Sequence, residues 1–265
     1  MTTVGVLHPG EMGAGIGAVL RARDVEVVWA GEGRGPSTAR RAAAAGLRDV
    51  GTIGAMAAEA DLIISICPPH AALEVAESVA RQGFSGTYLD ANAISPGTAA
   101  KVAATVSGAG YVDGGVIGSP PSEGNHTRLY LSGTGAAELV PLLNGGPLEA
   151  VALDGATTAA SALKMTYAAW TKGSAALLLA LRGSARGHGV ETALLQEWQR
   201  SQPDLLQRAE AAERSAVAKG WRWTAEMIEI ARTFTEAGQP SGFHQAAAEI
   251  YDRYEPPAEA DSAGS

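Results

Sequence analysis

Short apolar runs alternate with segments of helical spacing along the first half of the chain. The run Leu62–Ile66 is apolar throughout, which is typical of a strand covered on both faces of its sheet. The alternation predicts strands at Val4–Leu7, Val25–Ala30, Leu62–Ile66, Thr87–Asp90, Tyr111–Asp113, Arg128–Ser132 and Ala150–Leu153, and helices at Met12–Arg23, Ser37–Gly46, His70–Arg81 and Pro96–Val106. Strands and helices that follow one another in this way predict a mostly parallel, doubly wound sheet.

The pattern changes near Asp154, and only helical segments follow. The segment Thr157–Arg186 is rich in Ala and Leu and apolar on most sides, so other helices must cover it. Further helices are predicted at Glu191–Ser201, Pro203–Lys219, Thr224–Ala237 and Gly242–Arg253. An apolar stripe of the core or interface type lies within them, formed by Trp223, Met227, Ile230 and Phe234.

The expected fold class is therefore α/β: an N-terminal Rossmann-type doubly wound sheet followed by an all-α C-terminal domain. We expect a dinucleotide-binding domain at residues 1–155, a helical substrate and dimerisation domain at 156–254, and a disordered tail at 255–265. Ligands of open α/β sheets bind outside the carboxyl ends of the strands, so the active site is expected in a cleft between the two domains.

Composition narrows the class of protein. The chain has 265 residues and a net charge of −8, which argues against a nucleic-acid surface, since such a surface needs a basic stripe. We expect no signal peptide, no membrane span and a cytoplasmic location. The single cysteine, Cys67, excludes an intrachain disulfide and argues against a cysteine-based metal site, so no metal is expected.

The turn after the first predicted strand carries the clearest chemical signal. It reads His8-Pro9-Gly10-Glu11-Met12-Gly13, with His8 at the first glycine position of the G-x-G-x-x-G pattern, and it opens directly into a helical segment. This arrangement places backbone N–H groups and a helix N-terminus against a phosphate. We therefore expect the cofactor to contact Gly10, Glu11, Met12 and Gly13.

The segment after the second predicted strand bears on the choice of cofactor. Glu32 would suit the ribose of NAD, whereas Arg34 would accommodate the additional phosphate of NADP. Because Arg34, Ser37 and Arg40 form an anion-binding segment at a helix start, NADP is favoured over NAD. Pro68, Pro69 and Asn92 follow strands at their carboxyl ends and are expected near the nicotinamide and its ribose.

Several segments resemble one superfamily. Besides the glycine turn, these are Asp90–Pro96, similar to a loop near the nicotinamide, Tyr111–Pro120, similar to a substrate-binding segment, and Ser161–Met165, similar to the start of a long helix with a catalytic lysine. The chain thus resembles the β-hydroxyacid dehydrogenases, which are related to 6-phosphogluconate dehydrogenase and the imine reductases. Residues Trp221 to Glu229 resemble the branch whose helical domain has no known function.

The resemblance implies roles for individual residues. Lys164 would act as general acid or base, since burial in an apolar helix favours proton transfer near neutral pH, and Lys172 is a weaker candidate. Gly118, Ser119 and Pro120 would form the rim that faces the substrate.

Two departures remove polar contacts to a small hydroxyacid. Ile117 stands where the family usually has a serine, and Ala168 stands where it usually has an asparagine. A bulkier or less polar substrate is therefore favoured.

Three functions remain open. The first is NADP-dependent hydride transfer between nicotinamide and a carbonyl or alcohol, the second is reduction of an imine, and the third is a dinucleotide-binding sensor without catalysis. The long apolar helix also predicts a homodimer whose interface is formed by the helical domains.

Overall fold

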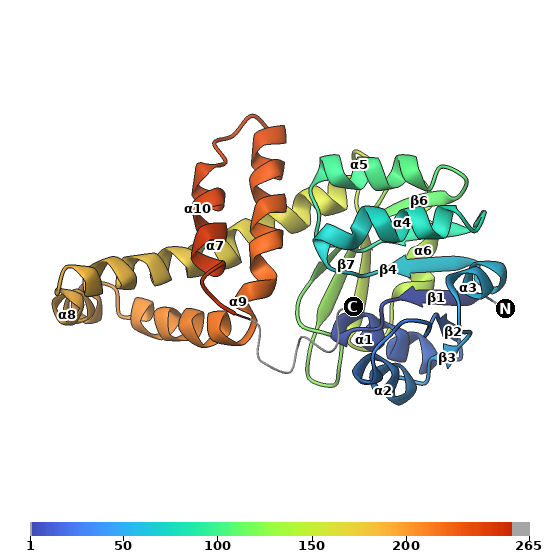
Figure 1. The fold of residues 1–265 in the computed structure, drawn as a ribbon, viewed down its shortest axis with the longest axis horizontal. Helices are drawn as coiled ribbons and strands as arrows, with labels where there is room; N and C mark the ends of the chain where they lie inside the picture. The colour runs from blue at the N-terminus through green and yellow to red at the C-terminus, as the bar shows by residue number, and fades with distance from the viewer. Residues whose placement is uncertain (1, 256–265) are drawn as a thin grey trace. The chain divides into compact units, whose positions relative to one another are not determined.

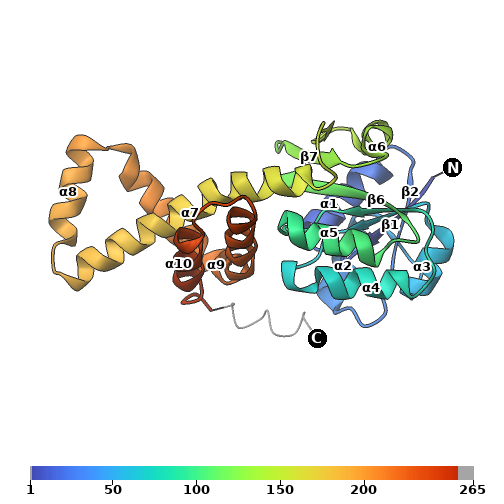
Figure 2. The ribbon, with the colours of Figure 1, turned by 90° about the horizontal axis from the view of Figure 1, so that it is seen from above.

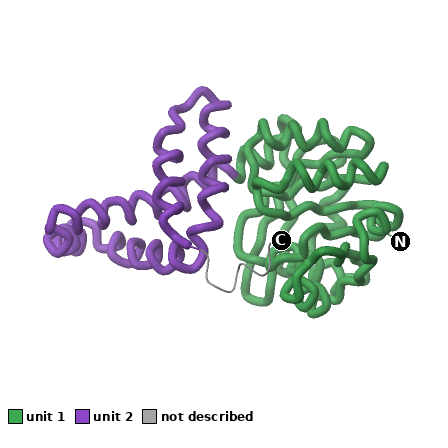
Figure 3. Tube along the Cα trace, viewed as in Figure 1, with its two compact units in different colours: residues 1–164, 261–265 green, residues 165–260 purple. Residues whose placement is uncertain are grey.

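The computed structural model describes residues 2–255, so the tail expected at 255–265 falls, except for its first residue, outside the described residues. The chain divides into two compact units, the first running to Lys164 and the second beginning at Met165 (Figure 3). Each unit has its own fold.

An eight-stranded sheet forms the centre of the first unit (Figure 1). Its strands are β1 (Thr3–Leu7), β2 (Glu26–Trp29), β3 (Arg48–Asp49), β4 (Leu62–Ser65), β5 (Thr87–Asp90), β6 (Gly110–Ile117), β7 (Thr127–Ser132) and β8 (Leu148–Ala152). They lie in the order β3-β2-β1-β4-β5-β6-β7-β8. All neighbours are parallel except β6 and β7, which are antiparallel. The predicted fold class is confirmed.

Helices cover both faces of this sheet. They are α1 (Glu11–Arg21), α2 (Pro36–Ala44), α3 (Ile53–Glu59), the short 3-10 helix η1 (Pro69–Ala71), α4 (Ala72–Ala80), α5 (Pro96–Thr105) and α6 (Ala136–Leu143). Side chains alternate along each strand, so Val4 and Val6 pack with α1, α2 and α6, whereas Ile63 and Tyr88 pack with α3, α4 and α5. Figure 2 shows α4 and α6 on opposite sides of the sheet.

Three elements of the first unit were absent from the predicted pattern. Strand β3 has two residues and helix α3 has seven, so neither produces a periodic signal of useful length. Helix α6 contains Pro141, which sequence rules treat as a break. Local capping explains α3, because the Thr52 hydroxyl accepts a hydrogen bond from the Ala55 N–H at 3.0 Å.

Four helices build the second unit, the first of which begins in the first unit. They are α7 (Ala159–Gly187), α8 (Glu191–Ser201), α9 (Asp204–Glu236) and α10 (Gly242–Tyr251). The prediction of separate helices at 203–219 and 224–237 is wrong, since α9 runs continuously through Gly220. A Cβ at Gly220 would lie 3.2 Å from the side chain of Tyr254, so this glycine permits close packing and does not end the helix.

The apolar stripe of α9 belongs to the core of the second unit. Met227 and Ile230 are fully buried. The Trp223 ring meets the edge of Tyr251 at 5.1 Å between centroids. Lys172 of α7 lies 5.8 Å from the Trp223 ring centroid and forms a partly buried ion pair with Glu226 at 2.9 Å. None of the helices within residues 2–255 has the length and apolar character needed to cross a membrane.

Candidate active site

The predicted cofactor and substrate segments share one edge of the sheet. Strands β1, β4, β5 and β6 are parallel, so their carboxyl ends meet there. The glycine turn follows β1, Pro68 and Pro69 follow β4, Asn92 follows β5 and Gly118 follows β6. Open parallel sheets bind their ligands at this edge.

The glycine turn has the backbone geometry of a phosphate site. Gly10 is the N-cap of α1, its N–H donates to the His8 carbonyl oxygen at 2.6 Å, and no side chain caps the helix. A Cβ on Gly13 would lie 3.0 Å from that same carbonyl oxygen, so only glycine allows this close packing. The first-turn N–H groups are thus uncapped by any side chain, which fits a dinucleotide diphosphate. Glu11 is exposed and Met12 half-buried.

An unpredicted carboxylate shapes the end of β2. One oxygen of Asp49 accepts hydrogen bonds from the N–H groups of Gly31 at 3.0 Å and Gly51 at 2.8 Å. A Cβ on Gly31 would overlap this carboxylate. Asp49 therefore fixes the course of the segment that carries Glu32 and Arg34.

The predicted anion-binding residues lie on the segment that begins α2. Gly35 is its N-cap without a capping side chain, Arg34 and Arg40 are exposed and Ser37 is half-buried. The positive charge of Arg34 acts on both His8 and Cys67, so its side chain reaches toward the ends of β1 and β4. Arg34 is thus connected with the edge that holds the glycine turn, whereas Ser37 and Arg40 lie further along the chain, in α2.

Asn92 joins the ends of β4 and β5 within the sheet. Its Oδ1 accepts from the Cys67 N–H at 2.6 Å, and its Nδ2 donates to Ser65 Oγ at 3.1 Å and to Asp90 Oδ1 at 2.7 Å. The side chain is 2% exposed. Its observed role is to position the turn that begins at Pro68, and its expected contact with the nicotinamide stays a prediction.

Asp90 is the most perturbed acid at this edge. Burial raises the pKa of its carboxyl to about 7, the charge of Asp113 adds to this effect, and hydrogen bonds from Asn92 oppose it. Tyr111 donates to its second oxygen at 3.4 Å. The carboxyl therefore changes its charge near neutral pH.

Asp113 of β6 holds the beginning of α7. Its carboxylate accepts from the Ser161 N–H at 2.7 Å, from the Ser161 hydroxyl at 2.5 Å and from the Ser132 hydroxyl at 3.2 Å. Ser132 Oγ in turn accepts from the Ala160 N–H at 2.9 Å. Hydrogen bonds to Asp113 and Ser132 of the sheet thus fix the first turn of the helix that carries Lys164.

Lys164 lies against β6, just beyond the end of β5. A Cβ on Gly115 would overlap the carbonyl group of Ala160 and would lie 3.1 Å from Lys164 Cβ. A Cβ on the preceding Gly114 would lie 3.3 Å from the Cα of Ala91. The half-buried Lys164 is therefore brought to the edge that the glycine turn also occupies.

The predicted substrate segment borders α1. Gly118 has a φ of +124°, and a Cβ there would lie 2.8 Å from the carbonyl oxygen of His126. Ser119 is exposed, and Pro120 is half-buried. A Cβ on Gly15 of α1 would lie 3.0 Å from the ring of Pro121, so the segment after β6 reaches the helix of the glycine turn.

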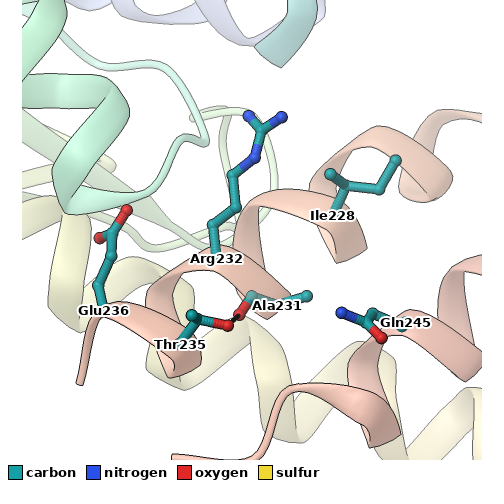
Figure 4. A pocket seen from close by; sticks show the side chains of 6 residues that line it. All are labelled: Ile228, Ala231, Arg232, Thr235, Glu236 and Gln245. Atoms are coloured by element: carbon teal, nitrogen blue, oxygen red, sulfur yellow. Dashed lines mark hydrogen bonds between the residues drawn. The ribbon is translucent and has the colours of Figure 1, made fainter. Parts of the chain in front are cut away.

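Two pockets lie in the second unit, away from every predicted site residue. One, of about 360 Å³, is lined by Ile228, Ala231, Arg232, Thr235, Glu236 and Gln245 (Figure 4). The other, of about 580 Å³, lies between α7 and α10. His244 and Tyr251 have core roles. The imidazole packs against Phe234 with 4.1 Å between ring centroids and a tilt of 55°, and the Tyr251 hydroxyl donates to the Lys172 carbonyl oxygen at 2.7 Å.

Sequence reasoning missed the three carboxylates that organise the site, Asp49, Asp90 and Asp113. Each stands in a strand, and Asp90 and Asp113 are buried. For Asp90 and Asp113 the available signal was an acid in a strand with apolar neighbours, because a buried carboxyl must find hydrogen-bond donors, whereas the exposed Asp49 gave no such signal.

The close approach of α7 to Gly115 predicts how a side chain at that position would change stability. Gly115→Ala should lower the free energy of unfolding by about 1–3 kcal/mol, because backbone of α7 must move to admit the methyl group. Urea unfolding measures this loss. Gly110→Ala is the matched control, since a Cβ there has no neighbour nearer than 3.6 Å. Equal stability of the two variants would show that α7 is not held tightly against β6.

Comparisons with known proteins identify relatives of the chain and of its fold. Residues 185–254 match a family described as a domain of unknown function, DUF1932. An uncharacterized 28.5 kDa protein of Methanothermus fervidus is 28% identical over 194 residues, which cover 73% of this chain and 74% of that protein. The conserved protein MTH1747 of unknown function, described as structurally similar to 3-hydroxyacid dehydrogenases, is 29% identical with a TM-score of 0.71, over 98% of this chain and 97% of that one.

More distant structures share the fold. A 3-hydroxyisobutyrate dehydrogenase from Salmonella typhimurium has a TM-score of 0.69 at 15% identity, over 95% of this chain and 93% of that one. An imine reductase from Streptomyces aurantiacus has a TM-score of 0.54 at 18% identity, over 99% and 96%. A reductive aminase from Aspergillus terreus, in complex with NADPH and ethyl-5-oxohexanoate, has 0.58 at 18%, over 96% and 93%. The chain thus combines the fold of the 3-hydroxyacid dehydrogenases and imine reductases with a C-terminal DUF1932 region, as its sequence resemblance implied.

Proposed function

We propose that the chain is an NADP-dependent oxidoreductase that transfers hydride between nicotinamide and a carbonyl or alcohol substrate. The observation that carries this proposal is the position of Lys164, held against Gly115 at the sheet edge that also carries the uncapped start of α1. A proton donor and a phosphate-binding turn then serve one site.

Different residues of the chain would bind the cofactor, donate the proton and position the donor in such a reaction. NADPH supplies the hydride when bound. The N–H groups that follow Gly10 bind the diphosphate, and the Lys164 ammonium gives its proton to the carbonyl oxygen as negative charge develops there. Asp113 acts indirectly, because it fixes the helix turn that begins at Ser161 and so aims Lys164.

Imine reduction is the rival reaction. An iminium carbon already carries positive charge, so it needs less help from a general acid. Ile117 and Ala168 are both fully apolar positions, and both are buried, which suits a less polar substrate. A sensor that binds the dinucleotide without turnover is the third function.

Replacing Lys164 separates the three functions. Lys164→Met should lower kcat for aldehydes and keto acids by about 10²–10⁴-fold and leave the Kd of NADPH within about twofold. Consumption of NADPH with matched panels of carbonyls and cyclic imines measures this, with Lys101→Met on the exposed face of α5 as control.

Each other outcome has its own meaning. Full carbonyl turnover in Lys164→Met would contradict the role of Lys164. Turnover with imines alone, unchanged by the substitution, would identify an imine reductase. Binding of NADPH without turnover on either panel would identify a sensor.

The preference for NADP rests on Arg34, and it gives a second prediction. Arg34→Ala should weaken NADPH by about tenfold or more and NADH by much less, because only NADPH has the additional phosphate. Isothermal titration with both dinucleotides measures the ratio. Arg81→Ala, which removes an exposed arginine at the C-cap of α4, is the control. Equal weakening of both cofactors would contradict a role of Arg34 in selecting NADP.

We further infer a homodimer formed through the helical unit. Tyr167, Trp170, Leu177 and Leu181 lie at helical spacing on α7 and are 41–63% exposed. Apolar side chains in such a row favour a second copy of the chain as the partner.

Sedimentation equilibrium tests this assembly. The wild-type chain should have twice its chain mass at micromolar concentration. Trp170→Ser should raise the dimer Kd by about 30-fold or more, since aromatic anchors dominate interfaces. Val217→Ser removes an equally exposed apolar side chain of α9 and should change little. A wild-type monomer would contradict the dimer.

A further inference from the structure

His8 combines two energetically unfavourable features, a strained backbone conformation and a buried polar atom without a hydrogen-bond partner. Its φ of +60° is in the left-handed region, where among the described non-glycine residues only Asp24 joins it. Its Nδ1 is buried and has no hydrogen-bond partner. Strain and an unsatisfied polar atom at one position point to a ligand that uses that position.

The backbone places His8 at the phosphate turn. It follows β1 directly, its carbonyl oxygen accepts from the Gly10 N–H, and a Cβ on Gly13 would lie 3.0 Å from that oxygen. Glycine would adopt the same conformation without strain. The imidazole is therefore not required for the turn to form.

Two arginines lie near the turn that carries the imidazole. Arg34 acts on it from the segment after β2, and Arg41 of α2 reaches the backbone of the same turn. Glu11 stands in the first turn of α1 and is exposed, and the thiol of Cys67 lies at the end of β4. Burial first, and then the charge of Arg34, lower the pKa of His8 to about 4, so the free imidazole is neutral at pH 7.

We propose that His8 is a proton-linked contact for the dinucleotide diphosphate. It is neutral in the free protein and takes up a proton from solvent at mildly acidic pH when the diphosphate binds beside Gly10. The proposal rests on the dinucleotide site of the proposed function. In the complex the imidazolium offers two N–H donors beside an anion, and the diphosphate neutralises the charge of Arg34 that disfavours it.

The size and sign of the effect follow from the two protonation states. An opposite charge within 4–6 Å raises the pKa of a base by about 1–3, which brings His8 from about 4 to about 5–7 in the complex. The complex then holds more protons than the free protein, so affinity increases as pH falls. Between pH 7.5 and 5.5 the gain is about 4-fold for a bound pKa of about 6 and about 20-fold for one of about 7.

Isothermal titration of the full chain with NADPH and NADH tests the proposal. Proton uptake is measured at pH 5.5 in two buffers of different ionisation enthalpy, and Kd is measured at pH 5.5 and 7.5. His8→Gly removes the imidazole and suits the positive φ, and His8→Asn is a second variant that tolerates this conformation. The difference between wild type and variants cancels the titration of the 2′-phosphate of NADPH, which all proteins share.

The wild type should take up more protons than either variant and should gain more affinity on acidification, from about 1.3-fold for a bound pKa of about 5 to about 20-fold for one of about 7. Equal proton uptake and equal pH dependence of Kd in all three proteins would overturn the role of His8 and leave the proposed function intact. Failure of the wild type to bind either dinucleotide would overturn both.

Discussion

The buried carboxylate of Asp113 is the interaction on which the site depends. It lies in the sheet and accepts hydrogen bonds from the first turn of α7, where the helix dipole also favours a negative charge. Burial raises the pKa of this carboxyl, and the bonds from Ser161 oppose the rise. One residue of the sheet thereby fixes the first turn of a 29-residue helix. Lys164 follows Ser161 by one helical turn, so its direction is inherited from this contact.

Periodicity was sufficient for the main elements of the fold. The strands that carry the site and the helices α1, α5, α7 and α8 agree with the pattern within a few residues. It was insufficient where tertiary packing overrides local preference. Gly220 reads as a helix break, yet Tyr254 packs against its bare backbone and α9 continues. No local rule contains that contact, because the two residues are far apart in the chain.

The candidate site likewise combines features set by local sequence with features set by tertiary packing. The glycine turn could be predicted from the sequence because its geometry depends on neighbouring residues of the chain. The partners of Asp90, Asn92 and Asp113 depend on strand register, in which Asp90 stands beside Asp113, and on the return of α7 to β6. Sequence reasoning could therefore name Asn92 but not find that its amide is committed to Cys67 and Asp90. Through those hydrogen bonds Asn92 connects the segments that follow β4 and β5. The charge next to this connection changes when the Asp90 carboxyl titrates.

The contact between Gly15 and Pro121 couples two segments of the chain that otherwise belong to different tasks. One lies in the helix that follows the phosphate turn, and the other follows the strand that leads to the substrate rim. A methyl group on residue 15 would press on the proline ring, so a larger side chain at this position requires the segment after β6 to shift. Under the proposed function, a change of shape near Pro121 would therefore also displace helix α1, so the substrate rim and the cofactor turn could not be altered independently.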